Sequence, residues 1–437
     1  MVAVGTNKLN VDDDRYGDGM QDREDTSSQY AFSRWLPVVG GLLLTMALGT
    51  FYATSIFILP LEKEFDWTRS QTSWITTFGA VMVACWFVVG GWLQDQKGPR
   101  IVAGIGGLLF SGAFLWGSQI HSLSAFYLSI GVCLGIGVGF GYVVPMAVGA
   151  KWFPDKRGLI VGLMVAGSGL GSGIFGPLAS RLIGRVGWRT TMQILSAIFF
   201  VMTAVATVLL KAPPEGYRPR GWSPTQVEKN SARSMSVSTR RMIRTPTFWL
   251  YWMAYCLGAT SGLMVISQLV PFARSAGNST AVAAFAITVG ALGNTMGRVF
   301  SGWISDYAGR VNTVRIALLF SAIAMPLLFR FRHEIVLFYI LLGVVYYCYG
   351  TQFSVYPSLS ADSYGTKHMG LNYGLLLMAW GVAGILGPFL GGHAYVETGD
   401  YQAAFYISAA LSLVALAILF APKAQPNGKI TEEPELD

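Results

Sequence analysis

Long apolar segments alternate with short polar ones along most of this chain. Twelve apolar segments of about 19 to 27 residues follow one another between residues 36 and 421. Each is long enough to cross the hydrocarbon core of a bilayer, about 30 Å thick, as one helix. The pattern predicts membrane-spanning helices at residues 36–60, 71–94, 100–119, 124–149, 157–180, 189–210, 248–272, 281–304, 312–330, 334–360, 370–394 and 402–421.

The composition agrees with a protein that crosses the membrane many times. Hydrophobic residues make up 53% of the chain and charged residues only 12%, with a mean hydropathy of +0.48. Soluble domains carry about 25% charged residues. The four cysteines all lie within apolar segments, which indicates packing rather than disulfides or a metal centre. We therefore expect an all-α membrane protein with no metal and no cofactor.

Three polar segments divide the chain. Residues 1–33 and 422–437 are polar and contain no apolar core, so we expect disordered tails there. The one long internal loop, 211–247, is rich in Pro and Ser and contains eight basic residues. These boundaries predict a six-helix bundle at 34–210, a basic linker at 211–247 and a second six-helix bundle at 248–421.

Basic residues gather on one side of the predicted membrane. The linker and the loops that follow even-numbered spans hold about sixteen Lys and Arg residues, against about eight on the other side. Because loops rich in Lys and Arg stay in the cytoplasm, we place the linker and both termini there, and the protein in the inner (cell) membrane. The same placement accounts for the net charge of +8 without a nucleic-acid partner.

The two halves of the chain repeat each other. The segment GGWLQDQKGPR (90–100) matches SGWISDYAGR (301–310), and GSGIFGP (171–177) matches GVAGILGP (381–388), both at an offset of 211 residues. Repeats of this kind place the substrate at their interface, near the middle of the bilayer. The matched pairs are Gly91/Gly302, Trp92/Trp303, Asp95/Asp306, Gly98/Gly309, Gly173/Gly384, Gly176/Gly387 and Pro177/Pro388.

These motifs resemble the major facilitator superfamily over nearly all of the spans. The duplicated G-x-x-x-D-x-x-G-R/K loop is that superfamily's signature, although Arg100 stands one place late in the first copy. The segments at 56–74, 151–173 and 364–388 resemble the oxalate/formate antiporter family, which is related to the monocarboxylate transporters. The resemblance implies the major facilitator fold, with twelve helices in two pseudosymmetric bundles.

The duplicated loop is expected to act as a gate. The resemblance implies that Asp95 and Asp306 hold the cytoplasmic side shut, either by pairing with Arg100 and Arg310 or by capping neighbouring helices. The alternative is a loop that only confers solubility and topology. The glycines of the two copies, which we include in the predicted gate, are Gly91, Gly98, Gly302 and Gly309.

Arg298 is the only formal charge in the long apolar run that precedes Asp306. A charge near the centre of a membrane helix costs about 2.5–3.5 kcal/mol even on insertion scales. No Asp or Glu lies deep in any other predicted span, and a guanidinium can hold a carboxylate with two parallel hydrogen bonds. We therefore predict that Arg298 binds an anionic substrate, as the resemblance also implies. The alternative is a structural arginine bonded to backbone carbonyls or snorkelling to the interface.

Two positions depart from the related families. The oxalate exchangers carry a lysine in the eleventh span at the place of Trp380, so a dianion loses its second cation here. The monocarboxylate transporters place an acid one turn before the arginine, where this chain has Asn294, which can orient a substrate but cannot titrate. These departures favour a monocarboxylate and place proton coupling through an intramembrane acid in doubt.

Aromatic side chains are expected to wall a pocket for a small anion. Tyr349 and Phe353 are four residues apart and therefore share one helix face. For each aromatic, packing within the membrane is the competing interpretation. The aromatics we assign to the pocket are Tyr52, Tyr142, Tyr349, Phe353 and Trp380.

The sequence therefore predicts a secondary transporter that moves a small organic anion by alternating access. The substrate we expect is a monocarboxylate such as formate, lactate or pyruvate, exchanged for another anion or carried with a proton. The runner-up is an antiporter of oxalate or another dicarboxylate with formate. A rival of another class is a membrane sensor that no longer transports, although the linker and tails are short for a signalling domain. We expect no enzymatic activity, a lipid bilayer as the surroundings, and a monomer.

Overall fold

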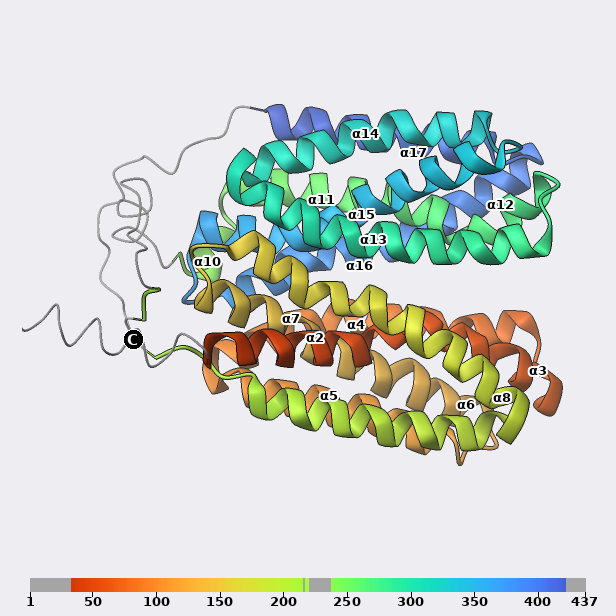
Figure 1. The fold of residues 1–437 in the computed structure, drawn as a ribbon, viewed down its shortest axis with the longest axis horizontal. Helices are drawn as coiled ribbons and strands as arrows, with labels where there is room; N and C mark the ends of the chain where they lie inside the picture. Colours follow the sequence, from red (N-terminus) through yellow and green to blue (C-terminus); the bar gives the residue numbers. More distant parts are fainter. Residues whose placement is uncertain (1–32, 215–216, 220–236, 422–437) are drawn as a thin grey trace, which may run out of the picture.

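The computed structural model describes residues 33–214, 217–219 and 237–421. The described part is helical and forms two bundles that lie side by side (Figure 1). The tails predicted at 1–33 and 422–437 lie outside the described residues, except for Ser33, and so do residues 215–216 and 220–236 of the linker predicted at 211–247.

The first half of the chain forms the lower bundle in Figure 1. Its first membrane span is irregular, because the 3-10 segment η2 separates two α-helical parts and carries Tyr52. The elements of this half are η1 (Ser33–Trp35), α2 (Leu36–Gly49), η2 (Thr50–Phe57), α3 (Ile58–Phe65), α4 (Arg69–Lys97), α5 (Pro99–Gly117), α6 (Leu123–Phe126), the π-helical η3 (Tyr127–Cys133), α7 (Leu134–Trp152) and α8 (Arg157–Leu209).

Helix α8 holds both the fifth and the sixth predicted spans. At 53 residues it is far longer than one crossing needs, since a helix rises 1.5 Å per residue. It breaks at Gly187, whose φ of 79° is open to glycine and strained for other residues. The loop predicted at 181–188 is therefore a turn at one glycine. The described residues contain eleven helices that are long and apolar enough to span a membrane. Because α8 crosses twice, they give twelve crossings.

The second half of the chain forms the upper bundle in Figure 1. The short helix α10 lies at the same end of the molecule as the beginnings of α2 and α8 and the end of α15. We call this end the linker side. The elements of this half are α10 (Thr239–Met242), α11 (Pro246–Ser267), α12 (Leu269–Ser275), α13 (Thr280–Ala308), α14 (Arg310–Arg330), α15 (Ile335–Tyr364), α16 (Met369–Thr398) and α17 (Gln402–Phe420).

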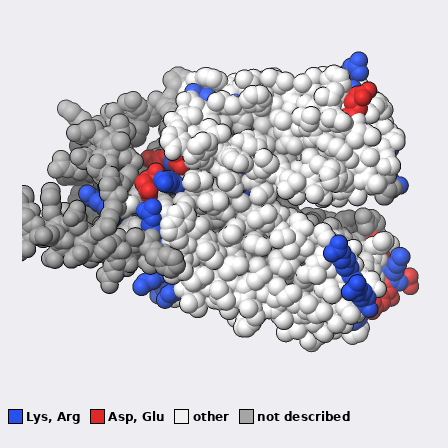
Figure 2. Space-filling view, in the orientation of Figure 1, with Lys and Arg blue, Asp and Glu red and all other residues white. Residues whose placement is uncertain are grey.

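Charged side chains lie at the two ends of the molecule, with an uncharged band between them in the view of Figure 2. Large apolar side chains are exposed along that band, among them Leu108, Val208 and Phe320. Lipid tails solvate such side chains and water does not, so the band marks the part that lies in the bilayer.

Two glycine-rich seams join the bundles, one between α8 and α13 and the other between α4 and α16. At each seam a Cβ added to any of three glycines would collide with the facing helix, so only glycine permits this approach. The colliding pairs are Gly158 with Gly302, Gly162 with Arg298 and Gly169 with Thr295 on the first seam, and Gly370 with Gly91, Gly374 with Phe87 and Gly381 with Ala84 on the second.

The two seams are copies of one another. Every residue of the second seam stands 211 or 212 places from its counterpart in the first, which extends the sequence repeat to the contacts between the bundles. In this comparison Arg298 corresponds to Phe87. The buried charge is therefore present in one half of the repeat and absent from the other.

Candidate functional site

The residues predicted to bind substrate meet at the centre of the molecule, between the two bundles. Tyr52 and Tyr142 come from η2 and α7 of the first bundle. The remaining side chains come from the second bundle, on α13, α15 and α16: Asn294, Arg298, Tyr349, Phe353 and Trp380.

Arg298 is the largest fully buried side chain in the described residues, with only 1% of its surface exposed. Its Nε donates a hydrogen bond to Asn294 Oδ1 at 3.0 Å, one turn earlier on the same helix. Its Nη1 reaches across to the first bundle and donates to Val165 O at 2.7 Å, to Tyr142 Oη at 3.3 Å and to Ser168 Oγ. The guanidinium therefore bridges α13 to α7 and α8.

All of these partners are neutral. Within the described residues no carboxylate forms an ion pair with Arg298, and its Nη2 makes no hydrogen bond. A buried charge without a counter-ion is costly even when hydrogen bonds surround it. The protein oxygens thus occupy Nε and Nη1 and leave Nη2 able to donate to a carboxylate oxygen.

Phe353 supports the guanidinium from one face. The Cζ atom of Arg298 lies 4.5 Å from the centre of the Phe353 ring, a cation–π distance. Tyr142 meets the same ring edge-on, with the ring centres 6.3 Å apart. Phe353 itself is 1% exposed, so its ring is fixed by its neighbours on both bundles.

Trp380 and Tyr349 form the second wall of the site. The indole Nε1 of Trp380 donates a hydrogen bond of 2.7 Å to the hydroxyl of Tyr349. The indole ring also packs against Phe353 and against Phe87 of the first bundle, with ring centres 5.9 and 6.0 Å apart. Trp380 therefore brings no charge to this wall, and its only polar group is already bonded.

Tyr52 stands at the mouth of the site. Its ring meets Trp380 edge-on at 6.4 Å, and 44% of its surface is exposed. Figure 2 shows the surface hollowed between the two bundles at the end away from the linker side. The side chains of Tyr52, Tyr142, Phe87, Phe353 and Trp380 line one pocket, which is a small space of about 10 Å³.

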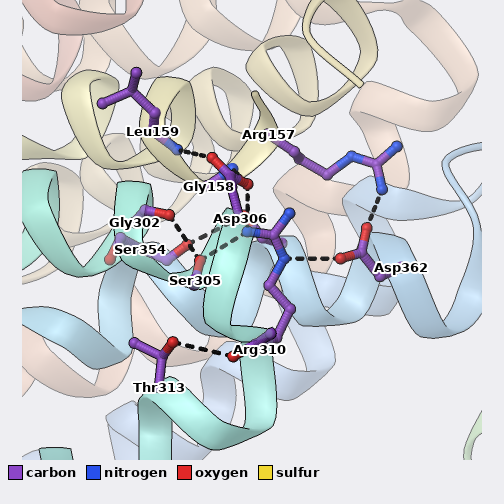
Figure 3. Close-up of polar contacts among 12 residues, drawn as sticks. Arg157, Gly158, Leu159, Gly302, Ser305, Asp306, Arg310, Thr313, Ser354 and Asp362 are labelled. Carbon is purple, nitrogen blue, oxygen red and sulfur yellow. Dashed lines mark hydrogen bonds and ion pairs between the residues drawn. The ribbon is translucent and has the colours of Figure 1, made fainter. Parts of the chain in front are cut away.

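A network of charges closes the linker side beside α8 (Figure 3). Asp306 Oδ1 accepts a hydrogen bond from the backbone N–H of Gly158 at 2.8 Å, and Oδ2 accepts one from Leu159 at 3.0 Å. Asp306 therefore caps the N-terminus of a helix in the other bundle, where a negative charge is stabilised.

Arg310 connects this cap to a second carboxylate. It donates from Nη1 to Asp306 at 2.5 Å and from Nε to Asp362 at 2.8 Å. Asp362 also pairs with Arg157 of the first bundle.

The first copy of the motif, which holds Asp95, makes the same cap, and among the described residues it has no such charge network. Asp95 accepts hydrogen bonds from the backbone N–H groups of Gly370 and Leu371, at 3.0 and 2.8 Å. The expected pairing of Asp95 with Arg100 is not formed. Arg100 follows Pro99, one place later than Arg310 in the repeat, and its Nη2 donates instead to Val208 O at 2.8 Å at the end of α8.

The glycines of the motif have two different structural roles. Gly98 and Gly309 have φ of 83° and 84° and turn the chain between consecutive helices, in a region that other residues rarely adopt. Gly91 and Gly302 belong to the two seams, where a side chain would meet the backbone of the opposite bundle. The predicted gate residues thus lie together on the linker side, with Arg100 turned away from the seam.

Some site residues were missed by the sequence reasoning. Val165, Ser168, Arg157 and Asp362 are joined to their partners across more than a hundred residues, and no spacing in the sequence signals such a contact. Phe87 could have been found, because it is the repeat counterpart of Arg298. Within the described residues, no group of three or more His, Cys, Asp or Glu is placed to hold a metal ion.

Comparison with known proteins agrees with this arrangement. The sequence model of the Major Facilitator Superfamily matches residues 40–325 and 272–436. The chain therefore belongs to the Major Facilitator Superfamily, and the predicted family and fold class are confirmed.

Several characterised or named relatives match most of the chain. The oxalate:formate antiporter of Oxalobacter formigenes is 28% identical over 88% of this chain and 90% of its own length. The uncharacterized transporter YhjX of Escherichia coli K12 is 28% identical over 82% and 88%. Monocarboxylate transporter 13 of Bos taurus is 26% identical over 91% and 93%. The expected likeness to these two transporter families is confirmed.

Solved structures confirm the fold alone, because their sequences are distant. The proton:xylose symporter XylE gives a TM-score of 0.68 at 16% identity and covers 91% of this chain and 97% of its own. FucP in an outward conformation gives 0.65 at 15% identity, over 88% and 97%.

Proposed function

We propose that this protein carries a small monocarboxylate, of the formate, lactate or pyruvate type, across the membrane by alternating access. The observation that carries the proposal is Arg298, a fully buried cation between the bundles whose hydrogen-bond partners are all neutral. Relatives named as an oxalate:formate antiporter and as a monocarboxylate transporter support an organic anion as the cargo.

In this proposal the substrate carboxylate replaces the missing counter-ion. Nη2 of Arg298 donates to one carboxylate oxygen, and the hydroxyl of Tyr142, which lies 3.3 Å from Nη1, can turn its proton toward the other. Asn294 orients the guanidinium through its 3.0 Å contact with Nε. Phe353 and Trp380 exclude water, which strengthens the charge interaction.

Because Arg298 is the cation of the site, we expect a substrate with one negative charge. A dicarboxylate brings a second negative charge into the pocket, and Trp380 offers it only an indole N–H already bonded to Tyr349. Leaving that charge unpaired in a buried site is costly. Exchange of oxalate or another dicarboxylate for formate is the second candidate, which the name of the Oxalobacter formigenes relative, an oxalate:formate antiporter, supports.

The proposed cycle uses the two seams as its moving parts. We infer that residues 34–210 and 248–421 rock against each other around the site, joined by the linker at 211–247. Asp95 and Asp306 latch the linker side by capping helices of the opposite bundle. The excess of basic residues on the linker side supports a cytoplasmic position for it and for both termini. Asn294 does not titrate, so this cycle suits exchange of one anion for another or a proton that travels with the substrate.

The test replaces Arg298 with Gln in proteoliposomes loaded with lactate, formate or pyruvate. Losing the charge-assisted hydrogen bonds should reduce counterflow of the labelled anion about a hundredfold. Arg330→Ala is the control, because Arg330 is exposed at the far end of α14. Wild-type counterflow in Arg298→Gln would contradict the site. A wild-type protein that binds these anions and never exchanges them would favour the sensor.

A further inference from the structure

A second group of aromatic hydroxyls lies between the Arg298 site and the linker side. Tyr255 on α11, Tyr356 on α15 and Tyr373 on α16 are each 0% exposed. None of the three hydroxyls has an aligned hydrogen-bond partner among the described residues. The hydroxyls of Tyr255 and Tyr373 are near enough to share one bond, which still leaves at least two O–H donors without an acceptor.

Phe353 separates this group from Arg298. Arg298 lies over the face of the Phe353 ring at 4.5 Å, and Tyr255 meets an edge of the same ring, with the centres 6.4 Å apart. Tyr255 is stacked on Tyr356, with their ring centres 4.2 Å apart and the planes 10° from parallel. Tyr356 follows Phe353 by nearly one helical turn on α15, toward the linker side.

Packing does not explain these hydroxyls. A phenylalanine would fill the same volume, whereas a buried O–H without an acceptor costs free energy. The three donors carry no charge, and no carboxylate is among their hydrogen-bond partners in the described residues. Neutral O–H donors suit an acceptor with negative charge, and a carboxylate is such an acceptor.

We propose that Tyr255, Tyr356 and Tyr373 form a second, weaker carboxylate site, which the substrate occupies after it leaves Arg298 toward the linker side. The proposal rests on the proposed function, since it takes the same anion as its ligand. An ion bound at a single strong site on its path leaves slowly. A weaker site beside it allows the ion to move on. Phe353 is the side chain that moves to connect the two sites when the linker side opens.

The experiment compares Tyr→Phe variants at 255, 356 and 373, singly and together, with Tyr346→Phe. Tyr346 is a matched control because it is also buried on α15, in a separate core. Labelled lactate or formate is the probe, whichever the wild-type protein carries. Counterflow and equilibrium binding are measured, with right-side-out and inside-out vesicles to separate the two faces.

We expect the triple variant to bind the anion within twofold of wild type and to melt no lower, because the three changes remove at least two unpaired donors. Its counterflow should fall at least fivefold, and its half-saturation concentration should rise only when the anion is added from the linker side. Unchanged counterflow would overturn the second site. Equal losses of binding and counterflow would also overturn it, since the hydroxyls would then belong to the Arg298 site. Only wild-type transport by Arg298→Gln would overturn the proposed function itself.

Discussion

At the scale of single residues, one charge and one indole define the pocket. Arg298 has Nε and Nη1 bonded to neutral oxygens and Nη2 without a hydrogen bond. Trp380 lines the neighbouring aromatic pocket and gives its N–H to Tyr349. The site thus places one positive charge behind the Phe353 ring of an aromatic pocket, which matches an anion with a single carboxylate.

Replacing Trp380 with Lys should shift the preference toward dicarboxylates. The ammonium would stand near the Tyr349 hydroxyl, across Phe353 from Arg298, where it can pair with a second carboxylate. We expect the ratio of oxalate to lactate uptake to rise about tenfold, equivalent to about 1.4 kcal/mol. Uptake competition in proteoliposomes measures the ratio. Trp380→Gln is the control, because it opens the same space without a charge and should leave oxalate excluded.

At the scale of helices, the seams decide how closely the bundles approach. Gly162 of α8 lies against the carbonyl of Arg298, so the tightest part of the first seam is also the backbone of the binding residue. Closure of the linker side and the position of the guanidinium are therefore linked through one helix contact. This contact gives the cycle a physical connection between its gate and its site.

Gly162→Ala should hold the linker side open. Its Cβ would collide with the Arg298 carbonyl, which the rigid backbone cannot avoid without separating α8 from α13. We expect the open population to rise at least tenfold, about 1.4 kcal/mol, and transport to slow. Pulsed spin-label distances between positions 156 and 312, both exposed on the linker side, report the change. Gly173→Ala on the same helix meets open space and should behave as wild type.

At the scale of the whole molecule, the repeat explains what could be predicted from the sequence. Hydrophobic segments located the spans, and the offset of 211 residues located both gate motifs, because both signals lie in local patterns. The sequence could not indicate that Ser168 and Val165 hold Arg298, or that Asp362 joins Arg157 to Arg310. Those contacts form only when the two bundles dock, and the local patterns of a single sequence do not show which residues meet there.

Docking also makes the two gates unequal. Beside α8, Asp306 is joined to Arg310, Asp362 and Arg157 across the bundles. Beside α16, Asp95 makes only its backbone cap, since Pro99 stands where the repeat has Arg310. We infer that the contacts around Asp306, beside α8, supply the larger part of the electrostatic energy that keeps the linker side closed.

Asp362→Asn should therefore loosen the linker side, and Arg100→Ala should not. Asp362 pairs with arginines of both bundles, whereas Arg100 bonds to Val208 within its own bundle. Because Asp362 is partly exposed, each pair contributes about 0.2–1 kcal/mol, so losing both predicts an open population larger by a factor of about 2 to 30. The same spin-label pair measures it. Raising salt to about 1 M should open the wild type in the same direction, because screening weakens the pairs, and should change Asp362→Asn less. Equal salt responses in the two proteins would show that these pairs do not hold the gate.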